Sequence, residues 1–131
     1  MEDIGKLILR VTTAGLILFH GIDKIIHGVS FIGPGLAQLH LPGFLAYGVY
    51  VGEVAAPLFM IAGAWTRLAA LVVMFNMAMA ILLEAHLNVL VIERTGAWGL
   101  EAEAFYFLTA LVVVLIGSGK YSLVRGRPAA V

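Results

Sequence analysis

Long apolar stretches separated by short polar breaks constrain this chain more than any other feature. Crossing the hydrocarbon core of a bilayer takes about 20 mostly apolar residues in a helix. Four stretches meet that requirement, at about residues 4–26, 44–64, 67–91 and 103–118. None of them shows the polar stripe at helical spacing that a helix of a soluble bundle needs. The pattern therefore predicts an all-α fold, an integral membrane antiparallel four-helix bundle.

Composition agrees with a membrane protein and excludes several classes of function. Of the 131 residues, 62% are hydrophobic and 12% are charged, whereas a typical soluble domain has about 25% charged residues. The formal net charge is zero, so no basic surface for nucleic acid is expected. The chain has no cysteine, which excludes disulfides, thiolate nucleophiles and dithiol redox chemistry. The first residues lack the basic region and cleavage site of a signal peptide, so we expect them to begin the first span.

We expect residues 1–124 to form a single membrane domain and residues 125–131 a short flexible tail. Lys and Arg residues accumulate on the cytoplasmic side of membrane proteins. Here Lys24 and Arg94 lie at one set of helix ends, and six basic residues lie at the other: Lys6, Arg10, Arg67, Lys120, Arg125 and Arg127. Arg10 is counted there because its long side chain can snorkel toward that side. The asymmetry predicts both termini in the cytoplasm, in a bacterial or archaeal cytoplasmic membrane, with the loops near 27–43 and 92–102 outside.

The ionisable side chains of the predicted spans gather in their outer halves. A charge among lipid tails costs about 2.5–3.5 kcal/mol even on the mildest scale, so such groups should point inward and pair. His20, Lys24 and His27 share one face of the first span, at i, i+4 and i+7. With partners from the other spans they predict an outward-opening polar pocket. The residues expected in it are His20, Asp23, Lys24, Glu53, Asn76, Glu84 and Glu103.

Glu53 is the most informative of these residues, because it lies deepest in its span, where no lipid-facing role is available. A purely structural pair with Lys24 or with His20 would also account for it. Asn76 would equally serve as a hydrogen-bonding contact between helices. Pro57 follows Glu53 by four residues, so it should leave a backbone carbonyl free at that level and kink the helix.

The predicted pocket identifies no catalytic residue, but it limits the ligands. A divalent cation would use His20, Glu53, Glu84 and His86, although no H-x-x-x-H or E-x-x-H spacing is present. We therefore expect no metal and keep this set as an alternative. A quinone needs donors for its carbonyls, acids for its protons and an apolar slot for its tail. This pocket offers all three, as do many membrane cavities, so a quinone is one candidate cofactor and the residues alone do not identify the cofactor.

Several elements in a fixed order resemble a known family. The first span has an early Arg followed by "HGIDK", and the second has an acid in "VGEVAAPLFMIAG". "TRLAALVVMFNM" opens the third span, and an acid at the head of the fourth precedes "GSGKYSL". Together these elements resemble the DoxX family of small four-span membrane proteins, over nearly the whole chain. The resemblance marks five polar positions: His20, Lys24, Glu53, Asn76 and Glu103.

The resemblance implies a broad range of roles, since some relatives are membrane subunits of thiosulfate:quinone oxidoreductases, others are linked to redox maturation or oxidative-stress complexes, and many have no assigned activity. We expect a quinone-associated subunit in the lipid bilayer that obtains electrons from a partner redox protein or a bound cofactor. One alternative is a non-enzymatic scaffold, assembly factor or lipid-binding protein. Another is a small transporter or metal-binding protein, which would need a homo-oligomer because four spans are few for alternating access.

Overall fold

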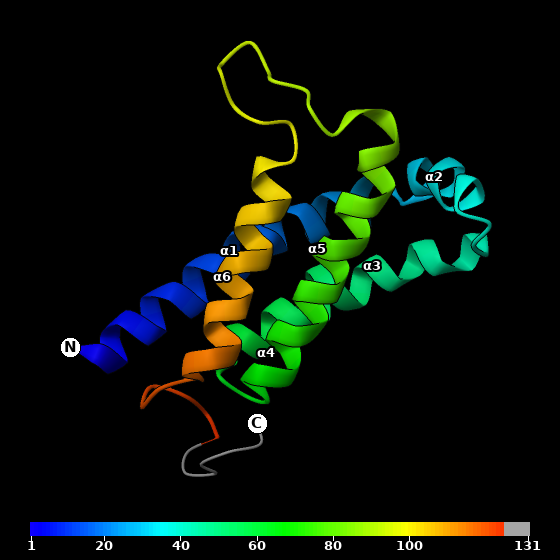
Figure 1. Ribbon diagram of the computed structural model, residues 1–131. Helices are drawn as coiled ribbons and strands as arrows, with labels where there is room; N and C mark the ends of the chain where they lie inside the picture. The colour runs from blue at the N-terminus through cyan, green and yellow to red at the C-terminus, as the bar shows by residue number, and fades with distance from the viewer. Residues whose placement is uncertain (125–131) are drawn as a thin grey trace.

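The structure is a computed structural model that describes residues 1–124, with only the backbone described at 85–88. Its regular elements are helical (Figure 1), and the predicted all-α class is confirmed. The elements are α1 (Glu2–His27), η1 (Ser30–Ile32), α2 (Gly33–Gln38), η2 (Gly43–Tyr47), α3 (Gly48–Tyr50), η3 (Val51–Ala55), α4 (Ala56–Ala62), α5 (Thr66–Asn88) and α6 (Glu101–Ile116). The predicted tail at 125–131 lies outside the described residues.

Three segments within the described residues are long and apolar enough to cross a membrane: α1, the run from η2 to α4 (Gly43–Ala62), and most of α5 (Thr66–Glu84). We call the second of these the second segment. The predicted fourth span at 103–118 is not among them. Its helix, α6, has 16 residues, fewer than the roughly 20 that a span takes. The helix ends at Ile116 because Gly117 takes a φ of 77° and leaves the helical conformation.

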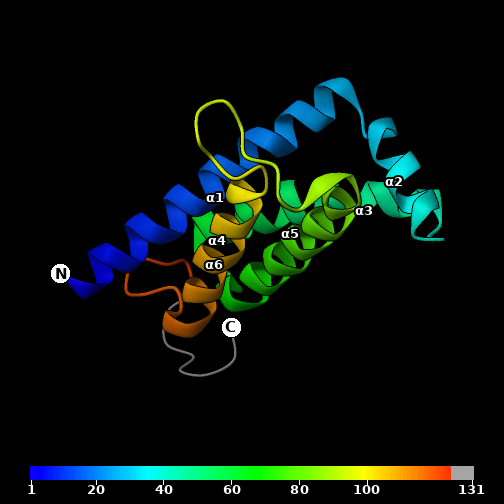
Figure 2. The same ribbon diagram turned by 45° about the horizontal axis from the view of Figure 1, so that its top comes forward.

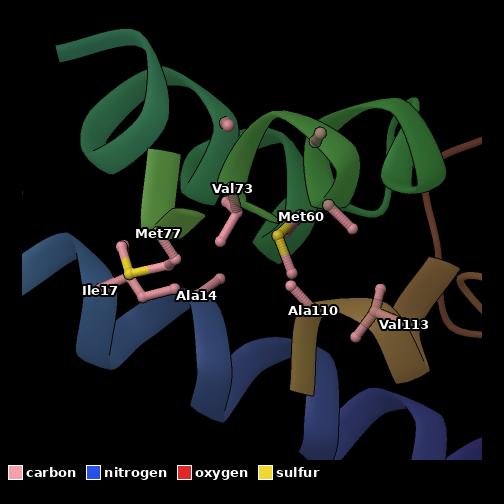
Figure 3. Close-up of a cluster of buried hydrophobic side chains, with 10 residues drawn as sticks. Ala14, Ile17, Met60, Val73, Met77, Ala110 and Val113 are labelled. Carbon is pink, nitrogen blue, oxygen red and sulfur yellow. The ribbon is translucent and has the colours of Figure 1, made fainter. Parts of the chain in front are cut away.

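The four main helices form a closed ring. α1 contacts α4 and α6, and α5 contacts the same two helices from the other side. Buried side chains from all four point toward one another at the centre, among them Ile17, Met60, Val73 and Val113 (Figure 3). Several of the other core residues are alanines, whereas large side chains such as Phe19 face outward. Helices that associate in lipid commonly pack in this way, because small residues at the contact let the helix backbones come close together.

The second segment is not a continuous α-helix. Around Glu53 it winds as a π-helix, η3, and α4 begins only at Ala56. Pro57 accounts for the position of this change, because it has no N–H to donate to the carbonyl of Glu53 one α-helical turn earlier. The sequence predicted a disturbance at this level but not the π-helix, a feature that often occurs at functional sites.

Two glycines allow the neighbouring helices to reach η3. A Cβ atom on Gly21 of α1 would lie 2.2 Å from the carbonyl oxygen of Glu53, and a Cβ on Gly52 would lie 2.5 Å from side-chain atoms of Asn76. Real Cβ atoms essentially never come so close. The absent side chains therefore let the backbone of α1 and the side chain of Asn76 on α5 pack directly on η3.

Arg10 joins three elements at the opposite end of the helices. Its side chain is buried, and the guanidinium donates hydrogen bonds to the carbonyl oxygens of Ser118 (2.5 Å), Tyr121 (2.6 Å) and Ile61 (3.5 Å). The side chain thus reaches toward the end of the helices that the sequence suggested, but it stays buried. Its terminal nitrogens donate to carbonyl groups near and beyond the ends of α4 and α6, where backbone acceptors lack helical partners.

The connector between α1 and the second segment (residues 28–42) folds into η1 and α2. Together with η2, where the second segment begins, it lies at the end of the helices away from the N-terminus (Figure 2). Leu36 is buried with Val29 and Ala46, and Leu83 of α5 packs against this small cluster. The apolar stretch at 30–43 therefore contributes to a small core of its own, which rests against the end of α5.

Replacing Gly21 with Ala should lower the melting temperature in mild detergent, because the added Cβ would overlap the Glu53 carbonyl. Overpacking of this kind costs about 1–3 kcal/mol. Gly15→Ala on the same helix is the matched control, since nothing lies within 4 Å of its Cβ position. That variant should melt at the wild-type temperature or above it, because Ala is a better helix former than Gly. Equal melting temperatures for the two variants would contradict the close contact.

Candidate functional site

An ion pair lies among the apolar helices near their connector ends. The ammonium of Lys24 on α1 donates to one carboxylate oxygen of Glu53 in η3, and Nδ2 of Asn76 on α5 donates to the other at 3.1 Å. The side chains of Glu53 and Lys24 are only 6% and 16% exposed. Of the two structural pairs that the sequence left open for Glu53, the pair with Lys24 is the one that forms.

The local structure of α1 and η3 brings the side chains of Lys24 and Glu53 together. Gly21, one turn before Lys24, lets α1 approach η3, and the π-helix places Glu53 at the contact. The Tyr50 hydroxyl donates to the backbone carbonyl of Lys24 at 3.0 Å and ties the end of α1 to the second segment. The paired charges form a neutral unit, which apolar surroundings tolerate far better than either charge alone.

A second group of polar side chains, which we call the rim, lies between α1, α5 and α6. It consists of His20, Glu84, Glu103 and Tyr106. The rings of His20 and Tyr106 meet edge to face, with centroids 5.9 Å apart and planes at 75°. Oε2 of Glu103 is buried and has no hydrogen-bond partner within the described residues. Glu84 interacts electrostatically with both Glu103 and Lys24, so the rim adjoins the ion pair.

Six of the predicted pocket residues are thus found in two adjoining groups: Lys24, Glu53 and Asn76 in the ion-pair group, and His20, Glu84 and Glu103 in the rim. Asp23 is not brought to either group. Its carboxylate is 68% exposed and contacts Nδ1 of His27 at 2.9 Å, one turn further along α1. Asp23 flanks the face that carries Lys24, and the structure turns it toward the outside of the helix ring.

The described part of the chain holds no group of three or more His, Asp or Glu side chains close enough to bind a metal ion. Within the alternative metal set, both oxygens of Glu53 already accept hydrogen bonds from Lys24 and Asn76. The side chain of His86, the fourth member of that set, lies outside the described residues.

Two tyrosines take part in the site without having been singled out from the sequence. Tyr50 and Tyr106 lie three residues from Glu53 and Glu103 respectively. Since residues three apart share a helix face, this spacing was the available signal. A tyrosine in an apolar helix is also typical of ordinary packing, so the spacing alone did not distinguish a site residue from a core residue.

The fold and the site define an all-helical membrane protein with a buried ion pair and an adjoining polar rim. The chain belongs to the DoxX family, whose model matches residues 5–86, well over half of the chain. The resemblance seen in the sequence is confirmed over that range, which includes Lys24, Glu53, Asn76 and Glu84 but ends before α6. The comparison with curated proteins found no match, and the comparison with solved structures found none either.

Removing one member of the ion pair should destabilise the fold more than removing both. Lys24→Met or Glu53→Gln alone leaves an unpaired buried group, and breaking a buried pair costs about 3–5 kcal/mol. The double variant buries no charge, so its melting temperature in mild detergent should recover much of the loss. Asp23→Asn is the control, because an exposed pair contributes about 1 kcal/mol or less. Additive losses in the double variant would contradict direct coupling.

Proposed function

We propose that this DoxX family protein is a quinone-associated redox subunit, and that its polar site binds the head group of a membrane-soluble quinone. The observation that best supports the proposal is the rim beside a buried ion pair, at one level of otherwise apolar helices. A quinone needs such surroundings, with polar groups for its ring oxygens and apolar helix surface for its tail. When bound, a quinone supplies two-electron, two-proton redox chemistry.

The rim residues have separable roles in this proposal. His20 donates a hydrogen bond to a ring oxygen, and Tyr106, whose ring packs on His20, helps to position the head group. Lys24 supplies positive charge nearby while its ammonium stays bonded to Glu53. Glu103 exchanges protons more readily than Glu53, because Oε2 of Glu103 has no hydrogen-bond partner within the described residues and both oxygens of Glu53 are engaged. Electrons come from a partner redox protein or a bound cofactor, since the chain has no cysteine.

The proposal includes four spans, with both termini cytoplasmic. α6 contacts α1 and α5 along the helix ring and begins beside the rim, with Glu103 in its first turn. At 16 residues it would cross a locally thinned bilayer or rely on flanking residues, as short spans do. This topology opens the rim and the connector to the outside and places the anchored Arg10 end at the cytoplasm.

Because the chain has no cysteine, single cysteines report the topology directly. Thr95→Cys and Lys120→Cys lie on either side of α6 at exposed positions. In intact cells a membrane-impermeant maleimide should label Thr95→Cys, and it should label Lys120→Cys only after the cells are permeabilised. Labelling of both positions from the same side would show that α6 does not cross the membrane.

Quinone binding is the direct test of the function. The purified protein in mild detergent should bind a short-chain quinone in isothermal titration, and His20→Ala should weaken the affinity about tenfold, as expected for loss of one hydrogen bond of about 1.4 kcal/mol. His40→Ala is the matched control, because His40 is exposed on the connector, outside the ion-pair group and the rim. Absence of binding to the wild-type protein would overturn the proposal, as would equal affinities for the two histidine variants.

The alternatives give different results in the same experiments. A scaffold or assembly factor would bind no quinone and would retain its partners when His20 is replaced. Gly52 packs on Asn76 inside the protein, so its replacement would report on folding and not on a partner surface. A small transporter would require a homo-oligomer, and a strict monomer in detergent would exclude it.

A further inference from the structure

A hollow of about 320 Å³ lies at the connector, between the residues that follow the end of α1 and the η2–α3 part of the second segment. Gly28, four residues after Lys24, contributes one wall, and Tyr47 and Tyr50 contribute another. Tyr50 also donates its hydroxyl to the Lys24 carbonyl. The hollow therefore lies about one helical turn beyond the Lys24–Glu53 pair, whereas the rim adjoins that pair between α1, α5 and α6.

Three glycines line this hollow, and their missing side chains help to keep it open. Nothing lies within 4 Å of the Cβ positions of Gly28, Gly33 or Gly43. Of the three, only Gly28 takes a positive φ, of 83°, so Gly43 can accept a side chain without that strain. Gly33 is helical directly before Pro34, a conformation that is disfavoured for a residue with a Cβ. Glycines also let a ligand approach the backbone closely.

The chemistry of the lining selects an uncharged ligand. Every lining residue is uncharged, and the polar groups among them include the hydroxyls of Ser30, Tyr47 and Tyr50. The Tyr47 and Tyr50 rings have centroids 6.4 Å apart and planes tilted by 36°, which offers aromatic surface to a ring. Phe31 and Phe44, next in sequence to lining residues Ser30 and Gly43, are 66% and 69% exposed and can accompany an apolar tail.

We propose that this hollow is a second binding site, for an uncharged, oxygen-bearing ring carried on an apolar tail. Its volume lies at the lower end of the range of about 300–1,000 Å³ seen for small-molecule sites. A charged head group would meet no opposite charge in the lining. Two membrane amphiphiles share the proposed chemistry, a glycolipid with a single sugar and a quinone, and the experiment below separates them. The site does not depend on quinone binding at the rim.

The test uses the full chain in a detergent without a sugar head group. Gly33→Leu should fill the hollow, and Gly48→Leu is its matched control. Both glycines have helical φ values, of −52° and −60°, and both have open space at Cβ, but Gly48 does not line the hollow. Gly43→Leu provides a second filling variant if Gly33→Leu melts below the wild-type temperature. Binding of a short-chain monoglucosyl lipid and of a short-chain quinone is measured by native mass spectrometry and titration.

We expect the filling variants to weaken binding of one amphiphile at least tenfold and Gly48→Leu to leave it unchanged. If the filling variants weaken binding of the glucosyl lipid, the hollow is a glycolipid site. If they weaken binding of the quinone, it is a quinone site. If neither amphiphile is sensitive to filling, the second site is overturned. A quinone affinity that falls in His20→Ala but not in the filling variants, with the glucosyl lipid also insensitive, would uphold the proposed function and overturn the hollow as a site.

Discussion

A carboxylate buried among apolar helices is tolerated only when a cation neutralises it and donors engage its oxygens. Glu53 meets both conditions through Lys24 and Asn76, and much of the surrounding structure serves this contact. Gly21 brings α1 against η3, Gly52 gives Asn76 room, and the π-helix before Pro57 sets the level of the carboxylate. Three apolar segments are thereby joined at one polar point.

The two ends of the helices use their charges differently. At the end with the N-terminus, Arg10 is enclosed and its two terminal nitrogens donate to backbone carbonyls. At the connector end, the ion pair adjoins a rim in which His20 and Glu84 are exposed and one oxygen of Glu103 lacks a hydrogen-bond partner among the described residues. The polar groups to which the proposed functions are assigned therefore lie at the connector end.

Membership of the DoxX family and three segments long and apolar enough to cross a membrane establish the kind of protein, and the polar geometry supports the proposed chemistry. The rim lies between α1, α5 and α6, whereas the hollow lies beyond the end of α1, and the two differ in character. The rim carries ionisable groups suited to proton exchange, whereas the hollow is lined by uncharged residues. A membrane protein with both could hold a reacting head group at one place and a neutral lipid or second quinone at the other.

The sequence by itself determined the helical class, the membrane environment and most of the polar site. Apolar runs of this length leave few alternatives to helices in lipid, and charges within them must face inward and pair, which identified Lys24 and Glu53. Tertiary structure decided the rest. Gly117 ends α6 early, and the π-helix orients Glu53. Asp23 turns outward and contacts His27. Arg10 donates hydrogen bonds to carbonyl oxygens of two other parts of the chain. The hydrophobicity and spacing of residues along one helix indicate whether that helix lies in lipid and which of its faces is buried. The ends of helices, the partners of side chains and the hollows depend on how separate helices pack together.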